Sequence, residues 1–154
     1  MLEKILHFLD EQQITYRSLS HEPTLTSEES ARVRGEALEI GGKALLLKVN
    51  KEFHLFVLSA ACKLNSSAIK TYFSVKKLRF ATSAELMDQT GLVPGSVPPF
   101  GRPIMNYSLY VDESIVQNER IAFNAGSLTH SVIMSVEDYL RLAQPTVFPF
   151  SSPT

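Results

Sequence analysis

The stretch from Lys43 to Ala60, KALLLKVNKEFHLFVLSA, constrains the fold more than any other part of the chain. Apolar residues fill it on both sides of a polar break at Asn50 and Lys51, which predicts two strands joined by a tight turn. Residues 53–58 are apolar apart from His54, and such a run is typical of a strand that is buried on both faces. The chain therefore places at least one strand of this pair in its core.

Helices and strands are predicted along the rest of the chain from apolar spacing and from capping residues such as Thr26, Thr82 and Ser135. Helices are expected at about residues 2–13, 26–34, 64–73, 82–90 and 135–143. Strands are expected at about residues 14–21, 43–49, 53–58, 76–82, 107–112, 120–126 and 130–135. The pattern predicts a mixed α/β (α+β) domain with about six or seven strands and short helices. No GxGxxG or GxxxxGK[ST] motif occurs, so a dinucleotide-binding or P-loop fold is not expected.

The length of 154 residues predicts one domain, at residues 1–143, followed by an irregular tail at 144–154 that contains three prolines. No apolar run approaches the ~20 residues of a membrane span. The single cysteine, Cys62, excludes an internal disulfide and favours a reducing, cytoplasmic setting. A net charge of −1 argues against bulk electrostatic binding of nucleic acid, and no DNA partner is expected.

One segment is nevertheless basic, because no Asp or Glu occurs between Phe53 and Ala84. Its basic residues are Lys63, Lys70, Lys76, Lys77 and Arg79. A lysine-rich surface exposed to water would explain them, and so would a patch that contacts phosphates. The sequence leaves both interpretations open.

Lys43 is the first candidate for chemistry. It shares one face of its strand with Leu45, Leu47 and Val49, and it follows two glycines directly. A lysine at the end of an apolar face can extend its ammonium to water. It can also hold that ammonium at the mouth of a pocket, where it would bind a carbonyl, carboxylate or phosphate.

The segment FNAGSLTHS, residues 123–131, is the second candidate. Gly126 and Ser127 are small enough to let a ligand approach the backbone, and their amides could donate to a developing oxyanion. A plain turn between two strands is the alternative. The four histidines show no metal-binding spacing and Cys62 has no cysteine partner, so neither a metal nor a cofactor is expected.

The stretch GLVPGSVPPFGRP, residues 91–103, holds three of the seven glycines and four of the eight prolines. Proline fixes φ and glycine permits dihedrals that other residues avoid. A structural crossover would explain part of this density. A run of thirteen residues with this composition favours the pre-shaped wall of a binding site. Such a wall would lose little conformational entropy when a ligand binds.

Taken in order, these segments resemble the YbaK-like aminoacyl-tRNA deacylases, relatives of the editing domain of bacterial prolyl-tRNA synthetases. The resemblance covers roughly residues 15–143. It is carried by His21 and Thr24, by the pattern Thr26-x-Glu28-x-x-Ala31, by Gly42-Lys43 before a run of leucines, by GLVPGSVPPFG and by FNAGS. It implies a barrel-like mixed sheet flanked by helices.

The resemblance also implies a trans-editing hydrolase that cleaves the ester of a mischarged tRNA, without metal, with a synthetase as a further partner. Lys43 would be catalytic, together with the backbone amides of Gly126 and Ser127. Substrate-binding roles would fall to His21, Thr24, Gly42, Gly95, Ser96, Val97, Pro98, Pro99, Phe100, Gly101, Asn124 and His130. The basic residues Lys63, Lys70, Lys76, Lys77 and Arg79 would contact tRNA phosphates.

Two other functions remain open at this point. The chain could be a non-catalytic module that binds a tRNA end or a small ligand in the same pocket, or a structural subunit. Relatives commonly have Ser-Pro or Thr-Pro where this chain has Pro98-Pro99, and some have a histidine near Asn124. The sequence therefore leaves the amino acid, the preferred tRNA and the oligomeric state open.

Overall fold

The strand pair predicted at residues 43–58 lies at the centre of the largest sheet. The structure, a computed structural model, describes residues 1–153. Strands β2 (Gly42–Val49) and β3 (Glu52–Ser59) are antiparallel and are joined at Asn50, whose φ is 59°. Their register sets Lys43 opposite Leu58, near the end of the hairpin that is far from this turn.

Three further strands complete this five-stranded sheet, in the order β5-β2-β3-β6-β9. Strand β5 (Leu78–Phe80) is antiparallel to β2, whereas β6 (Leu109–Val111) is parallel to β3 and β9 (Thr146–Val147) is parallel to β6. The sheet is therefore mixed, and the prediction of a mixed α/β domain is confirmed.

A second sheet has the order β1-β8-β7 and is antiparallel throughout. It consists of β1 (Tyr16–Ser20), β8 (His130–Ser135) and β7 (Arg120–Asn124). A parallel bridge between Gly41 and Ala122 connects it to the start of β2. A third sheet pairs β4 (Cys62–Leu64) with β10 (Ser151–Pro153). Among residues 1–153 these pairings form three sheets, two of them connected by this bridge, and no closed barrel.

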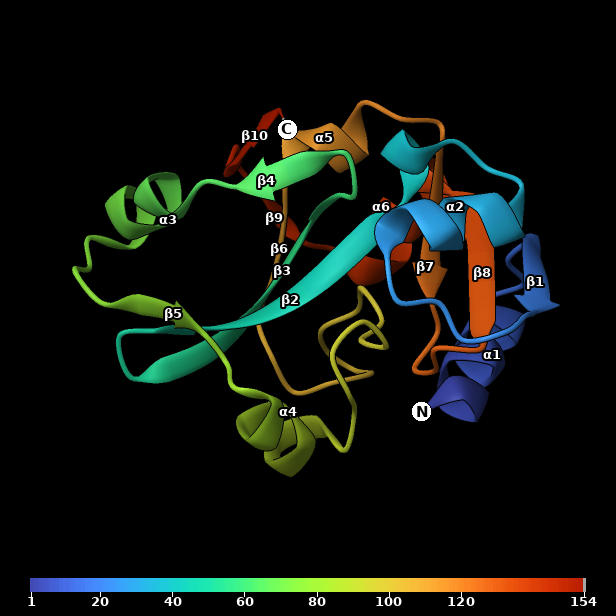
Figure 1. Ribbon diagram of the computed structural model, residues 1–154, viewed down its shortest axis with the longest axis horizontal. Helices are drawn as coiled ribbons and strands as arrows, with labels where there is room; N and C mark the ends of the chain where they lie inside the picture. Colours follow the sequence, from blue (N-terminus) through green and yellow to red (C-terminus); the bar gives the residue numbers. More distant parts are fainter. Residues whose placement is uncertain (154) are drawn as a thin grey trace.

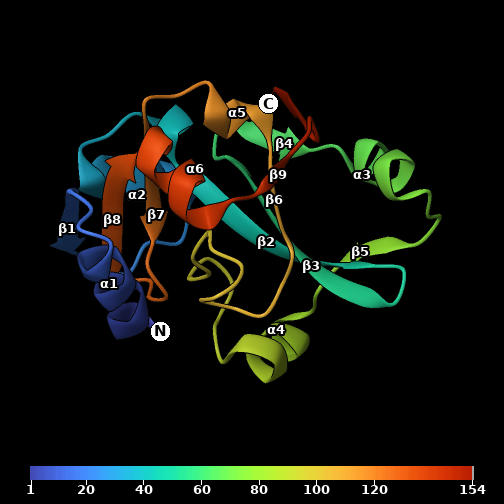
Figure 2. The same ribbon diagram turned by 180° about the vertical axis from the view of Figure 1, so that it is seen from behind.

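The helices are α1 (Leu2–Glu11), α2 (Ser27–Arg34), α3 (Ser66–Phe73), α4 (Ser83–Thr90), α5 (Glu113–Val116) and α6 (Val136–Ala143), with a 3-10 turn η1 (Leu38–Ile40). Helices α2 to α6 each begin where a capping side chain accepts from a free amide, whereas α1 and the 3-10 turn have no side-chain cap within residues 1–153. At the start of α2 the Thr26 hydroxyl accepts from the Glu29 amide at 3.1 Å, and the helix ends at Gly35, whose φ is +68°. A left-handed residue at this position ends many helices. Helix α2 and helix α6 lie on opposite sides of the molecule (Figures 1 and 2).

Residues 144–153 belong to the segment that the sequence predicts to be an irregular tail, and they include the short strands β9 and β10. Phe150 is fully buried against Phe56, with 5.4 Å between ring centroids. The buried Asp112 accepts from the Phe150 amide at 2.6 Å and from the Ser151 hydroxyl at 2.5 Å. These contacts hold the tail against the core between β9 and β10. Within residues 1–153, no helix has the length and apolar character that crossing a membrane requires.

Candidate functional site

A cavity of about 320 Å³ opens between α2, the start of β2 and the glycine- and proline-rich residues 91–103, the Gly/Pro segment. Its walls are made of backbone-rich, small and hydroxyl-bearing residues, with two cationic side chains. The lining residues are Thr24, Leu25, Thr26, Ser27, Ser30, Arg34, Gly41, Gly42, Lys43, Ala44, Leu45, Ala60, Pro94, Gly95, Val97, Asn124 and Leu128. None of these residues is acidic. The cavity therefore favours neutral or negatively charged groups over positively charged ones.

Lys43 is one of the two cations, and β2 carries it into the cavity wall. Its side chain is half-buried, and within residues 1–153 it forms no ion pair. Burial lowers the pKa of the Lys43 ammonium, although Cys62 and Glu28 act in the opposite direction. An ammonium without a carboxylate partner is available to bind oxygen atoms of a ligand.

Arg34 is the second cation, and no pattern in the sequence indicates it. It ends α2 with only 8% of its surface exposed. Its Nε donates to the Ser131 hydroxyl at 2.9 Å, and its Nη2 donates to Oδ1 of Asn124 at 3.0 Å. Burial lowers the pKa of the guanidinium to about 10, which still leaves it charged at neutral pH. Arginines in the last turn of a helix are common on exposed surfaces. Nothing local in the sequence therefore indicates that Arg34 is buried, because its burial depends on the distant contact with Ser131 on β8.

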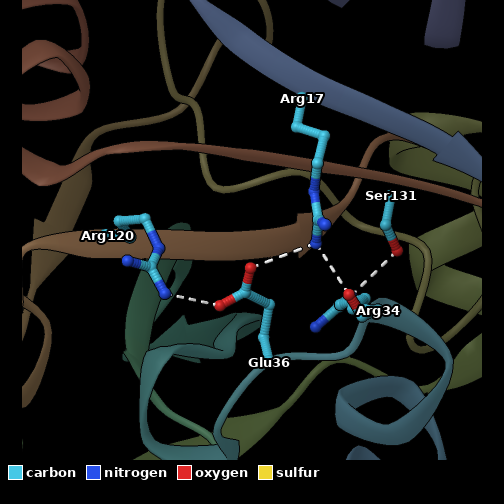
Figure 3. Close-up of polar contacts among 5 residues, drawn as sticks. All are labelled: Arg17, Arg34, Glu36, Arg120 and Ser131. Carbon is cyan, nitrogen blue, oxygen red and sulfur yellow. Dashed lines mark hydrogen bonds and ion pairs between the residues drawn. The ribbon is translucent and has the colours of Figure 1, made fainter.

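The backbone beneath Arg34 is held by a surface network (Figure 3). Arg17 donates to the carbonyl oxygen of Arg34 at 2.6 Å and to Glu36 at 3.0 Å, and Arg120 donates to the other oxygen of Glu36 at 2.6 Å. Glu36 thus bridges β1 and β7 just after α2 ends. This network fixes the end of the helix, and with it the position of the guanidinium.

The Gly/Pro segment has two parts with different roles. Pro94, Gly95 and Val97 line the cavity, and the Gly95 carbonyl accepts from Nδ2 of Asn124 at 2.8 Å. The other predicted residues, Ser96, Pro98, Pro99, Phe100 and Gly101, are buried away from the lining. Phe100 packs edge-on against Tyr139, and the Tyr139 hydroxyl donates to the Pro99 carbonyl at 2.6 Å. One half of the segment therefore forms the wall and the other half anchors it in the core.

The end of β7 contributes Asn124 to the lining and the turn after it contributes Leu128, but Gly126 and Ser127 do not line the cavity. Gly126 has a φ of +79°, and a Cβ on it would stand 2.5 Å from Cγ of Met1. This glycine is therefore required both by its left-handed backbone and by the close approach of α1. The Ser127 hydroxyl contacts the Thr129 hydroxyl at 2.9 Å. Of the three residues predicted to be catalytic, only Lys43 lines the cavity.

The predicted histidines lie beside the cavity and not in its lining. His21 contacts the Ser131 hydroxyl at 2.8 Å, so it reaches the hydroxyl that orients Arg34. His130 contacts the hydroxyls of Ser18 at 2.7 Å and Ser20 at 3.2 Å on the sheet surface. Thr24 and Gly42, by contrast, line the cavity. Among residues 1–153, no group of three His, Cys, Asp or Glu side chains could hold a metal ion.

The basic segment lies apart from the cavity. Helix α3 and strand β5 occupy one end of the long axis, whereas α1, β1 and β8 occupy the other (Figures 1 and 2). Lys63, Lys76 and Lys77 are exposed, and Lys70 is half-buried. Arg79 binds both oxygens of Glu85, at 2.7 and 3.0 Å, which makes it less available to phosphate than the lysines are.

The family model of the aminoacyl-tRNA editing domain matches residues 21–142. The chain belongs to this family. The matched range includes all the lining residues of the cavity. The resemblance seen in the sequence is therefore confirmed.

Three individual proteins illustrate this similarity. The chain is 32% identical to the multifunctional Ser/Thr-tRNA deacylase ProXp-y of Escherichia coli, over 96% of this chain and 91% of that protein. It is 25% identical to the prolyl-tRNA editing protein ProX of Acetoanaerobium sticklandii, over 92% of this chain and 90% of that protein. A solved structure of a candidate trans-editing enzyme for prolyl tRNA synthetase superimposes with a TM-score of 0.84, at 21% identity, over 98% of this chain and 96% of the other. That structural likeness concerns the fold alone.

Proposed function

We propose that this protein is an aminoacyl-tRNA deacylase that acts in trans on mischarged tRNA, with seryl and threonyl esters as its substrates. Membership of the editing family supports the reaction class. The similarity to ProXp-y, a protein named for its action on Ser- and Thr-tRNA, supports the choice of acyl group. A synthetase as partner remains a prediction, supported by the similarity to a prolyl-tRNA editing protein.

The observation that carries the proposal is the position of Lys43. Its ammonium belongs to the wall of a cavity that contains no acidic residue, and it has no ion-pair partner among the described residues. A positive charge fixed in such a cavity stabilises negative charge that develops on the ester oxygen. The partial burial of Lys43 strengthens this interaction relative to bulk water.

In the proposed reaction a water molecule attacks the carbonyl carbon of the ester. The carbonyl oxygen becomes negatively charged, and Lys43 stabilises it. The bond from the carbonyl carbon to the ribose oxygen then breaks, and the water proton is transferred to that oxygen. The products are the free amino acid and a tRNA with an intact 3′-terminal hydroxyl. The ester is already an activated bond, so the reaction needs no strong general base. Backbone donation from Gly126 and Ser127 stays a prediction of the sequence.

The test is a deacylation assay with Ser-tRNA and Thr-tRNA that carry a labelled amino acid. We expect release well above spontaneous hydrolysis with the unaltered protein, and a loss of about 100-fold or more in kcat for Lys43→Met. Lys48→Met is the matched control, because Lys48 lies on the same strand but not in the lining and contacts the ring of Phe53.

Lys48→Met should keep the activity of the unaltered protein. No release above the spontaneous rate would refute the proposal. Binding of charged tRNA without release would instead support a non-catalytic binding module. Full activity of a folded Lys43→Met variant would remove Lys43 from the reaction and leave the activity in place.

A further inference from the structure

The end of α2 carries a buried cation that the proposed hydrolysis does not use. Arg34 lines the same cavity as Lys43, but the ester chemistry needs only one positive charge at the carbonyl oxygen. We propose that Arg34 determines specificity: its guanidinium donates a hydrogen bond to the side-chain hydroxyl of the seryl or threonyl group. This inference rests on the proposed function and adds the residue that reads the acyl group.

The guanidinium has more N–H donors than acceptors around it. It carries five N–H groups. One N–H on Nε binds Ser131 and one on Nη2 binds Asn124. Among residues 1–153 neither hydrogen of Nη1 has an acceptor. Nη1 lies 3.8 Å from the position that a Cβ on Gly41 would take, and Gly41 is part of the cavity wall. Arg34 itself also lines the cavity, so Nη1 lies next to the cavity wall.

The orientation of this donor is fixed. Bonds to Ser131 and Asn124 hold the plane of the guanidinium, and Arg17 holds the carbonyl of the same residue. A planar donor held at both ends loses little entropy when it binds a ligand. A ligand without an acceptor would displace water from Nη1 and leave a buried donor unpaired, which is costly.

A pair of hydroxyl groups lies next to Arg34. Ser30 precedes it by four residues, on the same face of α2, and its Oγ is 2.7 Å from Oγ1 of Thr24. Both residues are buried and both line the cavity. Two hydroxyls that share one hydrogen bond keep one hydrogen and several lone pairs for a ligand. This end of the cavity therefore offers donors and acceptors together.

A ligand hydroxyl matches that set, because it accepts from Arg34 and donates to the Thr24–Ser30 pair. A methyl group can do neither. An ammonium side chain cannot accept, and the two cations of the cavity would repel it. A carboxylate side chain could accept both from Arg34 and from the remaining hydrogen of the hydroxyl pair, and the two cations would attract it. An aspartyl ester is therefore the most informative competitor.

The first part of the test compares esters on the unaltered protein. One tRNA is charged in turn with serine, 2-aminobutyrate, threonine, valine and aspartate, and kcat/KM is measured for each. Serine and 2-aminobutyrate have nearly the same shape, as do threonine and valine. We expect a preference of about 10-fold to 100-fold for the hydroxyl in each pair, the range for a hydrogen bond to a charged donor. This comparison needs no variant to fold.

The second part measures the same ratios in Arg34→Met and Arg34→Lys. Arg34→Met should bring both ratios close to one, and Arg34→Lys should leave an intermediate preference, because it keeps the charge without the planar fork. Arg32→Met is the matched control, since Arg32 is exposed on the same helix. It should keep the ratios of the unaltered protein. Circular dichroism and thermal unfolding establish that each variant is folded.

The outcomes separate this inference from the proposed function. If no ester is hydrolysed, both fall. If esters are hydrolysed without a preference for the hydroxyl, or with a preference for aspartate, only the role of Arg34 falls. A hydroxyl preference that survives in a folded Arg34→Met also overturns it. A purely structural role for Arg34 predicts that all five esters slow by the same factor.

Discussion

The side-chain amide of Asn124 donates to the Gly95 carbonyl at 2.8 Å, and the oxygen of the same amide accepts from Arg34 at 3.0 Å. One residue at the end of β7 thus joins the Gly/Pro wall to the end of α2. Both partners line the cavity. The wall and the buried cation are therefore positioned together, although they are about sixty residues apart in the chain.

Asn124→Asp separates the contact with Gly95 from the contacts of Oδ1. That oxygen accepts from Arg34 and, at 3.2 Å, from the Ser131 hydroxyl. An aspartate can still accept from Arg34, but it cannot donate to the Gly95 carbonyl, and its charge faces that oxygen. We expect the Gly/Pro wall to loosen and KM for seryl-tRNA to rise by about 10-fold, because an acceptor–acceptor contact replaces a hydrogen bond. Steady-state deacylation kinetics measure this.

Asn106→Asp is the matched control for that variant. Asn106 is exposed and also accepts from an arginine, with 2.8 Å between its Oδ1 and Nε of Arg102, but it lies outside the cavity lining. It should leave KM unchanged. An Asn124→Asp variant with unaltered KM would show that the contact with Gly95 does not shape the site.

Tyr139→Phe tests the anchor of the Gly/Pro segment. The buried Tyr139 hydroxyl donates to the Pro99 carbonyl, and burial raises the pKa of the phenol, so it stays protonated. Its removal leaves a buried carbonyl without this donor, which should lower the free energy of unfolding by about 1–3 kcal/mol. Urea unfolding measures the loss.

Tyr16→Phe is the control. It removes only an exposed contact with Asp10 and should lower the free energy of unfolding by less than about 0.5 kcal/mol. Equal losses in the two variants would contradict the anchoring role.

Local signals in the sequence identified most of the long elements. The caps at Thr26, Thr82 and Ser135 each receive the amide three residues later, so the contact is contained within four residues. The apolar runs of β2 and β3 are likewise visible in the sequence alone. Strands β4, β9 and β10 were missed because they are two or three residues long and exist only through pairing. Ser151, for example, pairs with Leu64, and no local pattern encodes that distance.

The same distinction applies to the site. Lys43, Gly42, Thr24, Gly95, Val97 and Asn124 were all predicted and all line the cavity. Arg34 was not predicted, because its burial depends on Ser131, which lies 97 residues further along the chain. The proline-rich half of the Gly/Pro segment was assigned to the wall because proline density alone cannot distinguish a ligand-facing segment from a core-facing one.

Asp112→Asn tests how the C-terminal segment is held. Burial raises the pKa of Asp112, but hydrogen bonds from Ser114, Ser151 and the Phe150 amide outweigh it, so the pKa lies below its ordinary value. A carboxyl whose pKa is lowered by folding stabilises the protein above its unfolded pKa of ~3.9, and this stabilisation is lost as pH falls through the folded value. We expect the variant to lose about 3 kcal/mol at pH 7 and the difference to shrink below about pH 4.

Thermal and urea unfolding across pH check this dependence, with Asp88→Asn as the control. Asp88 is exposed on α4 and should show no comparable loss at pH 7. A loss for Asp112→Asn that stays constant from pH 7 to pH 3 would contradict the role of the charged carboxylate. It would point instead to the shape of the side chain.

Charge reversal at Lys76 and Lys77 tests whether the basic segment contacts tRNA. Both side chains are exposed, whereas Arg79 in the same segment is engaged by Glu85. Each phosphate contact contributes about 0.7–0.9 to the slope of log affinity against log salt concentration. The double variant Lys76→Glu, Lys77→Glu should therefore weaken tRNA binding and reduce this slope by about 1.5, whereas Arg79→Gln should change it little. Because the segment lies far from α2, deacylation at saturating tRNA should keep its kcat while KM rises. A slope that is the same for the double variant and the unaltered protein would assign these lysines to the solvent-exposed surface alone.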